Sequence, residues 1–228
     1  LRPKYFSRKA CFENLLHTIK NQNDCKMHVI FDGDMNNHFI TEYASIVSIK
    51  NINAGNGAKS FLEAIDFATS IGDLEDIIYF VEDDYLHRPG WIKILIVGFT
   101  ISDNVWISLF DHFDKYYLRL PEYLKSSYQM YKDSLYSVTV TDSIHWKSAV
   151  STTDTFAIKK KDLLKYLEVI KHFSTIAHHS LDHDRGIYLN RIGFKLWTSL
   201  PGYSTHVESE YLSPIIDWES VQNNENYE

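Results

Sequence analysis

The first half of the chain alternates between two hydrophobic periods. Apolar positions recur at helical spacing over 7–20 and 60–71, and a further helix is predicted from Pro89 to about Phe99. Short apolar runs rich in β-branched and aromatic residues separate these helices, at 26–31, 44–49, 76–81 and 105–110. This order predicts an α/β domain with a mostly parallel central sheet flanked by helices. Such sheets bind their ligands at the carboxyl ends of the strands.

The second half is less regular. Residues 111–135 lack a clear period and are rich in Tyr, which predicts a long functional loop. Strands are predicted near 136–141, 154–158 and 194–199, helices near 160–173 and 181–192, and a polar, acidic tail over 217–228. Because no linker interrupts the pattern, we expect residues 1–228 to form one domain.

Charge and composition exclude two classes of partner. The 228-residue chain has a formal net charge of −7 and no basic stripe beyond 159–161, which argues against nucleic acid. The longest apolar stretch, 91–110, is interrupted by Lys93 and by polar residues at 102–104, so no transmembrane segment is expected. Only two cysteines and no Asn-x-Ser/Thr acceptor occur, which favours a cytoplasmic location.

The acidic triplet Glu82-Asp83-Asp84 is the strongest chemical feature of the sequence. It directly follows the apolar run 76–81, at the end of the strand where ligands bind. Adjacent carboxylates repel one another, and a hard divalent cation such as Mg²⁺ or Mn²⁺ offsets that repulsion. A solvated acidic turn is the alternative for a bare triplet. Its position after a buried strand favours the metal site.

A second acidic element, Asp182-His183-Asp184, opens the helix predicted over 181–192. One of its carboxylates is a candidate general base for a hydroxyl nucleophile. Stabilisation of the helix start by the macrodipole explains the same carboxylates equally well. The nearby histidines have no spacing typical of zinc sites.

The loop before the helix at 60–71 carries Gly57 and Lys59, which could present an amide and an ammonium group to phosphates. The loop lacks the Gly-Lys-Ser/Thr order of a P-loop, so a simple helix-entry turn is the default interpretation. No Gly-x-Ser-x-Gly motif supports a serine hydrolase.

Taken in order, these elements resemble the GT-A fold glycosyltransferases, especially the inverting, family-2-like enzymes, over roughly residues 4–216. The most specific segment is FVEDDYLHRPGW at 80–91. The resemblance implies a Rossmann-like fold and a metal-binding Asp-x-Asp-type motif. It gives Glu82, Asp84 and the late His206 as metal ligands, and Asp182 as the catalytic base. It also gives Asp32 as a contact to the nucleotide base or ribose and, as a weaker match, Asp111 as a contact to the donor or acceptor sugar. Asp34, Asp83 and the loop residues Gly57 and Lys59 complete the expected donor contacts.

Two departures from the family pattern stand out. Leu181 takes the place of a Glu that precedes the catalytic Asp, which leaves Asp184 as a competing base. The family also begins with a β-strand ahead of the helix at 7–20, and only six residues precede that helix here. The strand is therefore expected to be shortened or to lie ahead of Leu1.

The expected activity is transfer of a sugar, with inversion, from a UDP- or GDP-sugar to a glycan or glycolipid hydroxyl. Residues 1–110 would hold the nucleotide sugar, and 111–216 would hold the acceptor and the base. The acceptor could bring the enzyme to a membrane surface, and aromatic residues of 116–136 or Trp146 could stack on it, with core packing an equal alternative. The other readings are a sugar nucleotidyltransferase and a non-catalytic carbohydrate-binding domain.

Overall fold

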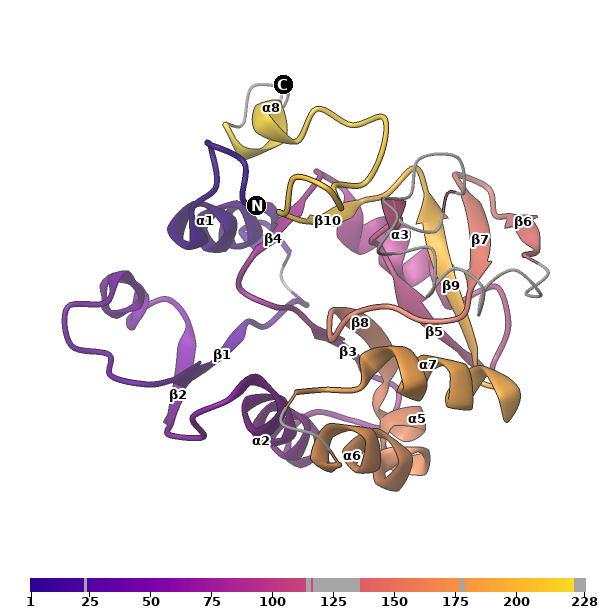
Figure 1. The fold of residues 1–228 in the computed structure, drawn as a ribbon, viewed down its shortest axis with the longest axis horizontal. Helices are drawn as coiled ribbons and strands as arrows, with labels where there is room; N and C mark the ends of the chain where they lie inside the picture. Colours follow the sequence, from indigo (N-terminus) through magenta and orange to yellow (C-terminus); the bar gives the residue numbers. More distant parts are fainter. Residues whose placement is uncertain (23, 114–115, 117–135, 177–178, 224–228) are drawn as a thin grey trace.

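The computed structural model describes residues 1–22, 24–113, 116, 136–176 and 179–223 (Figure 1). In chain order, the first half contains α1 (Arg8–Ile19), β1 (His28–Asp32), the 3₁₀ helix η1 (Phe39–Tyr43), β2 (Ser48–Ile52), α2 (Gly57–Ser70), β3 (Ile77–Phe80), β4 (Tyr85–His87), α3 (Trp91–Gly98) and β5 (Val105–Ser108). The second half contains β6 (Val138–Val140), β7 (His145–Ala149), β8 (Phe156–Lys159), α5 (Lys160–Lys165), α6 (Leu167–Thr175), α7 (Asp182–Arg191), β9 (Lys195–Leu200), β10 (Ser204–His206) and α8 (Trp218–Gln222).

The described strands form three sheets. The largest has six strands in the order β3-β8-β5-β9-β7-β6. Strands β1 and β2 pair in parallel as a separate two-stranded sheet, from His28 opposite Ser48 to Asp32 opposite Ile52. The third sheet pairs β10 with β4 in antiparallel orientation and brings His206 opposite Tyr85.

The fold is mixed α/β, but the prediction of a mostly parallel sheet is wrong. Among the described strands of the six-stranded sheet, β5 and β9 are parallel and the other neighbours are antiparallel. Strands β3 and β5, which α3 connects, run in the same direction because both are antiparallel to β8. Strand β8 comes from the second half of the chain and lies between them. Alternation of helices and strands along the first half does not indicate such an insertion.

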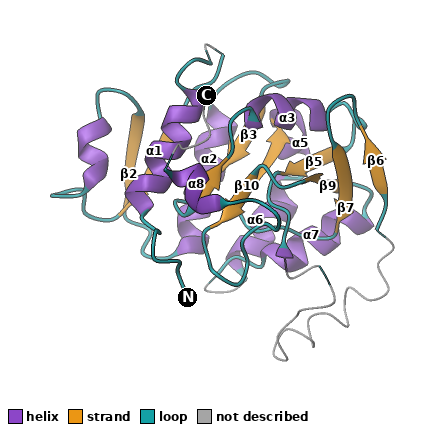
Figure 2. Ribbon diagram, turned by 90° about the horizontal axis from the view of Figure 1, so that it is seen from above, coloured by secondary structure: helices purple, strands orange, loops and turns teal. Residues whose placement is uncertain are grey.

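Helices cover both faces of the large sheet (Figures 1 and 2). Helices α2, α5, α6 and α7 form one layer, and α3 packs on the other face against β5 and β9. Side chains of β5 alternate accordingly, since Trp106 packs with the α2 layer while Val105 and Ile107 pack with α3. Trp146 is fully buried in the α3 cluster, so it is a core residue rather than a stacking platform for an acceptor.

Two predicted helices have different limits in the structure. The helix predicted from Pro89 begins at Trp91, because Gly90 before it has a left-handed φ of 77°. The single helix predicted over 160–173 is two helices, α5 and α6, separated at Tyr166. The Tyr166 hydroxyl donates a hydrogen bond to Asn104 Oδ1 at 3.1 Å, which ties the break to the loop before β5.

The segment predicted as a polar tail contains α8. Trp218 and Val221 of this helix are buried against α1 and β4, in a cluster with Cys11, Leu86 and Val207. The functional loop predicted over 111–135 lies largely outside the described residues. In the part of the chain that the structure describes, every helix is too short or too polar to cross a membrane.

Candidate functional site

A cleft of about 1710 Å³ lies between β1, β3, α1 and α2. It receives side chains or backbone from the end of β1, the start of α2, the segment after β3 and the first turn of α7. The predicted site residues that line it are Asp32, Gly57, Glu82, Asp83, Asp84 and Asp182. The predicted site residues that do not line it are Asp34, Lys59, Asp111, Asp184 and His206.

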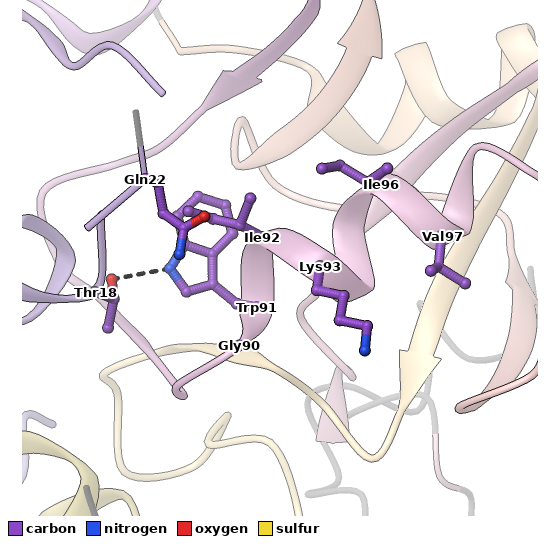
Figure 3. Close-up of a pocket in the computed structure, with 8 residues that line it drawn as sticks. All are labelled: Thr18, Gln22, Gly90, Trp91, Ile92, Lys93, Ile96 and Val97. Carbon is purple, nitrogen blue, oxygen red and sulfur yellow. Dashed lines mark hydrogen bonds between the residues drawn. The ribbon is translucent and has the colours of Figure 1, made fainter. Parts of the chain in front are cut away.

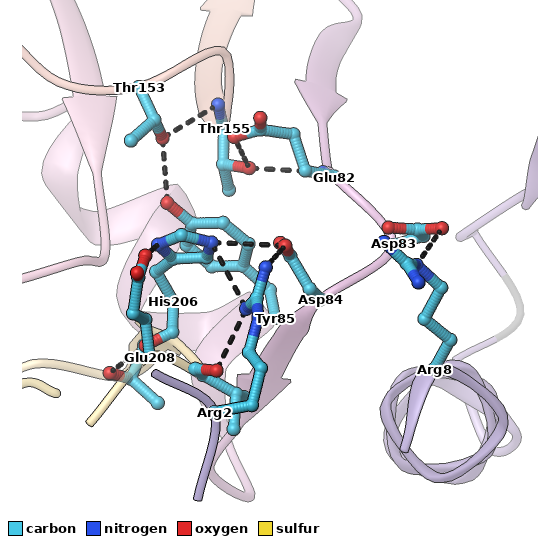
Figure 4. Close-up of polar contacts among 12 residues, drawn as sticks. Arg2, Arg8, Glu82, Asp83, Asp84, Tyr85, Thr153, Thr155, His206 and Glu208 are labelled. Atoms are coloured by element: carbon cyan, nitrogen blue, oxygen red, sulfur yellow. Dashed lines mark hydrogen bonds and ion pairs between the residues drawn. The ribbon is translucent and has the colours of Figure 1, made fainter. Parts of the chain in front are cut away.

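The three carboxylates of the acidic triplet point to different partners (Figure 4). Glu82 Oε2 accepts a hydrogen bond from the Thr155 hydroxyl at 3.1 Å. Asp83 is largely exposed and pairs with Arg8 Nε of α1 at 2.9 Å. Asp84 turns the opposite way, towards β10. The triplet therefore does not converge on one cation in this arrangement.

Asp84 meets His206 across the β4–β10 sheet. The pairing of these two strands brings His206 Nε2 to 3.0 Å from Asp84 Oδ2, although the residues are 122 positions apart. Arg2 Nη2 donates to the same oxygen at 2.6 Å (Figure 4). The Tyr85 ring stacks on the imidazole, with ring centroids 5.4 Å apart. The structure thus brings together Asp84 and His206, two of the three predicted metal ligands.

Asp84 and His206 shift each other's pKa values. Burial alone would raise the pKa of Asp84, but hydrogen bonds from His206 and Arg2 outweigh it and hold that pKa below its ordinary value. Burial alone would lower the pKa of His206, and the Asp84 carboxylate outweighs it and raises that pKa. Asp84 is therefore stabilised as the anion, and His206 is stabilised as the cation when no metal is bound.

The surroundings of Asp84 are compatible with a divalent cation. Asp84 Oδ1 is buried and has no hydrogen-bond partner among the described residues. Carboxylate and imidazole both bind Mn²⁺, and Mg²⁺ is commonly held by one or two carboxylates together with substrate phosphates. No set of three His, Cys, Asp or Glu side chains within the described residues could enclose a metal. Asp84 with His206 would hold the cation, and Glu82, which contacts Thr155 in this arrangement, stays a predicted ligand.

Glu82 lies in the most strongly perturbed environment of the triplet. Burial raises the pKa of its carboxyl group to about 7, and the neighbouring charges of Asp154 and Asp84 add to the increase. Its backbone N–H also donates to Thr155 Oγ1 at 3.0 Å, so Thr155 fixes both ends of the residue. This carboxyl group can exchange a proton near neutral pH.

Asp32 has a structural role in the loop that precedes α2. Its carboxylate accepts hydrogen bonds from Ala54 N at 2.8 Å, from Gly55 N at 3.0 Å and from Ser60 Oγ at 2.6 Å. The Ser60 hydrogen bond, with those from the two amides, lowers the pKa of Asp32. These contacts hold the loop so that Gly57 faces the cleft. Asp32 therefore lines the cleft and also fixes the loop that leads to Gly57.

The structure distinguishes the two candidate bases on α7. Asp182 lines the cleft, whereas Asp184 does not. Asp182 Oδ1 accepts a hydrogen bond from His183 N at 2.7 Å, which fixes the carboxylate at the first turn. The His183 ring is turned to Ser151 Oγ, 2.8 Å from its Nδ1. Position alone therefore favours Asp182 as the residue that reaches a bound ligand.

Asp154 is a cleft residue that the sequence analysis missed. It lies two residues before β8 and fell within the strand predicted over 154–158, so it was not considered as a site residue. Its Oδ1 accepts from Arg185 Nη1 at 2.7 Å and from Ser180 Oγ at 3.1 Å. Arg185 is completely buried, and its guanidinium lies over the rings of Phe61 and Phe156. No motif in the sequence indicated this pair, although a charged residue on the inner face of a short helix requires a buried partner.

Asp111 belongs to a separate polar cluster outside the cleft. Its buried carboxylate accepts from Lys147 Nζ at 3.0 Å and from the Tyr116 hydroxyl at 2.8 Å. Lys147 also lies over the Tyr116 ring, 3.9 Å from its centroid. This ion pair satisfies Asp111 within the protein, so its predicted donor contact has no support from its position.

A second, smaller pocket of about 250 Å³ lies between the end of α1 and α3 (Figure 3). Trp91 forms its floor and donates from Nε1 to Thr18 Oγ1 at 2.9 Å. Its other lining residues are mostly apolar, with Gln22 and Lys93 at the rim, and none was a predicted site residue. The pocket is below the roughly 300–1,000 Å³ typical of small-molecule sites, so we assign it no function.

Comparison with known proteins gives no family for this chain. No protein-family model matches it, and no curated protein matches it in sequence. The geometry of the cleft is therefore the basis on which a function is inferred.

Proposed function

We propose that this protein is a metal-dependent glycosyltransferase of GT-A type that uses a nucleoside-diphosphate sugar. The observation that carries the proposal is the contact between Asp84 and His206 at the edge of a cleft that Asp182 also lines. A cation site next to a cleft with a separate carboxylate would supply the two functions that suit transfer of an activated sugar. A residue pair that holds a cation would place positive charge beside the departing diphosphate, and the carboxylate would accept the proton of the attacking hydroxyl.

Asp84 and His206 would hold Mn²⁺ or Mg²⁺ together with the diphosphate. When bound, the cation neutralises the negative charge that grows on the leaving diphosphate. Arg2, now on Asp84 Oδ2, is a second cation close enough to contact phosphate oxygens at the same place. An acidic protein with a net charge of −7 needs such local positive charge to bind an anionic donor.

Asp182 is the proposed general base. It would accept the proton of an acceptor hydroxyl that attacks the sugar from the face opposite the diphosphate, which gives inversion. The transition state has oxocarbenium-ion character, as in glycoside hydrolysis. The donor would be of UDP or GDP type and the acceptor a glycan or glycolipid.

Titration calorimetry with UDP and with GDP, in Mn²⁺ and in EDTA, tests the cation site. We expect binding in Mn²⁺ that is lost in EDTA and that weakens in Asp84→Asn and His206→Gln. The loss should be at least roughly 10–100-fold, the effect of changing even an outer partner of a metal ligand. Asp66→Asn is the matched control, because Asp66 is an exposed carboxylate paired with Lys171 on the surface.

Two outcomes would contradict the proposal. If the nucleotide binds as strongly in EDTA, and to Asp84→Asn, as it does to wild type in Mn²⁺, no cation takes part in binding at this site. Metal-dependent nucleotide binding without transfer or hydrolysis of any UDP- or GDP-sugar would instead support a non-catalytic binding domain.

A further inference from the structure

Arg185 is a buried cation whose ionic partner lies in the cleft. Its side chain is 0% exposed, and its Nη1 donates to Asp154 Oδ1 at 2.7 Å. The guanidinium carbon lies 5.1 Å from the ring centroids of both Phe61 and Phe156. Burial of an ion pair costs free energy, and apolar residues of similar size in its place are often as stable or more so. Stability of the core is therefore a weak explanation for this pair.

Asp154 uses one of its carboxylate oxygens within the protein and leaves the other for a ligand. Oδ1 accepts from Arg185 Nη1 at 2.7 Å and from Ser180 Oγ at 3.1 Å, and within the described chain nothing donates to Oδ2. The side chain lines the cleft and is 15% exposed. Because Arg185 already compensates the negative charge, Oδ2 suits a neutral donor such as a hydroxyl better than a second cation.

The start of α7 packs directly on the segment that carries Asp154. The His183 ring places Nδ1 2.8 Å from Ser151 Oγ. At Gly186, an added Cβ would lie 2.7 Å from Ser151 Cα, closer than side-chain carbons approach, so the absence of a side chain allows this contact. Together with the Arg185–Asp154 ion pair, these contacts fix the orientation of Asp154 relative to α7.

Asp154 lies between the two chemical groups proposed for the cleft. On one side, the hydroxyl of the adjacent Thr155 donates to Glu82 of the acidic triplet at 3.1 Å (Figure 4). On the other side, Ser180 donates to Asp154 and stands two residues ahead of Asp182. Glu82, Asp154, Ser180 and Asp182 all line the cleft. A sugar held between a cation-bound diphosphate and Asp182 would therefore lie against Asp154.

We propose that Asp154 is a sugar-binding residue, whose Oδ2 accepts a hydrogen bond from a ring hydroxyl of the transferred sugar, and that Arg185 is the positioning residue that holds it. The identity of the ligand rests on the proposed function, whereas the subsite itself requires only a ligand with hydroxyl groups in the cleft. A carboxylate fixed in this way cannot turn towards another partner. The site should therefore select sugars that have a hydroxyl at this point, because a buried acceptor left without a donor weakens binding.

Calorimetry with matched pairs of ligands in Mn²⁺ isolates the contribution of the sugar. The pairs are UDP with UDP-glucose, UDP with UDP-galactose, and GDP with GDP-mannose. The ratio of the two dissociation constants in a pair removes the contribution of the nucleotide. Asp154→Asn should shift this ratio against the hexose conjugate by about 10–100-fold, the effect of losing a hydrogen bond to a charged acceptor. Its affinity for the free diphosphate should equal that of wild type.

Three further variants separate binding from folding. Asp154→Asn leaves Arg185 without its counter-ion, so the double variant Asp154→Leu/Arg185→Met is measured beside it, because exchange of both partners for apolar residues is often neutral for stability. It should lose the same sugar contribution. Arg185→Lys should lose part of it, since it keeps the charge without the guanidinium fork. Asn190→Ala is the matched control: Asn190 Nδ2 donates to Ala149 O at 3.2 Å from the other end of α7, outside the cleft, so the ratio should stay that of wild type.

A wild-type ratio in the folded double variant, or diphosphate binding without binding of any conjugate, would overturn the proposal. An equal shift in Asn190→Ala and Asp154→Asn would also overturn it, because the effect would then come from the packing of α7. Failure of the proposed function is a separate result, the absence of Mn²⁺-dependent nucleotide binding in wild type. In that case, saturation-transfer NMR with free glucose, galactose and mannose decides on the subsite. Contact with wild type that is lost in the double variant supports it, and contact with both proteins or with neither overturns it.

Discussion

At the scale of single residues, Glu82 links the site to pH. Burial raises its pKa from the ordinary 4.5 to about 7, so between these values the folded protein holds a proton that the unfolded chain releases. The free energy of unfolding should therefore fall as pH rises through this window, by roughly 3 kcal/mol from this residue. The Glu82→Gln variant has no ionisable group at this position. Its free energy of unfolding, measured with urea in EDTA, should therefore increase relative to that of wild type between pH 5 and pH 8. An equal difference at both pH values would contradict the raised pKa. Glu63→Gln, at an exposed ion pair with Lys50, is the control.

Asp182 and Asp184 offer a comparison of two carboxylates on one helical turn. If Asp182 is the base, Asp182→Asn should lower kcat by about 10²-fold or more while nucleotide affinity changes little. Asp184 lies outside the cleft, so Asp184→Asn should change only the helix start, by roughly 0.3–1 kcal/mol. Steady-state kinetics with the donor that calorimetry identifies, after a check of folding by circular dichroism, measures both. If only Asp184→Asn loses activity, the general base is Asp184 and the match of Asp182 to the family's catalytic Asp is shifted by two residues.

At the scale of elements, the start of α2 depends on one side chain. Asn56 caps the helix by accepting a hydrogen bond from Lys59 N at 3.0 Å. Asn56→Ala should lower the free energy of unfolding by about 1 kcal/mol, whereas Asn56→Asp keeps the acceptor and should cost little. Chemical denaturation of the three proteins measures the difference. Equal stability of wild type and Asn56→Ala would mean that Asp32, which holds the preceding loop, fixes the helix start by itself.

The sequence predicted elements better than their pairing. Helices α1 and α2 and strands β1 and β3 were predicted within a few residues, because the helices have apolar positions at helical spacing and the strands are short apolar runs. Strands β4, β7 and β10 were missed; β4 and β10 have three residues each and are too short to show a period, and β7 (HWKSA) contains no apolar run. Sheet order was also not predictable, because it depends on contacts between distant segments. For the same reason the contact of His206 with Asp84 was expected only from a family resemblance, and the Asp154–Arg185 pair was not expected at all.

At the scale of the whole molecule, α8 connects the end of the described chain to its beginning. Gln222 Nε2 donates to Tyr5 O at 2.6 Å, and α8 packs against α1 and β4. Strand β4 follows Asp84 and pairs with β10, which carries His206. The C-terminal helix therefore supports the sheet that brings the two proposed metal ligands together. A change in α8 should affect the site although it lies outside the cleft.

Trp218 tests this connection. It is 2% exposed, packs with Cys11, Leu86 and Val207, and donates from Nε1 to Ser213 O at 2.8 Å. Trp218→Ala should lower the free energy of unfolding by about 3–5 kcal/mol, the usual range for removing a buried Trp. Trp218→Phe keeps most of the packing and loses the hydrogen bond, so it should cost far less. Because Asp84 directly precedes β4 and β10 carries His206, Trp218→Ala should also weaken Mn²⁺-dependent nucleotide binding at temperatures where the protein remains folded. Unfolding and calorimetry on the same samples separate the two effects. A large loss of stability with unchanged binding would show that the β4–β10 sheet keeps its geometry without α8.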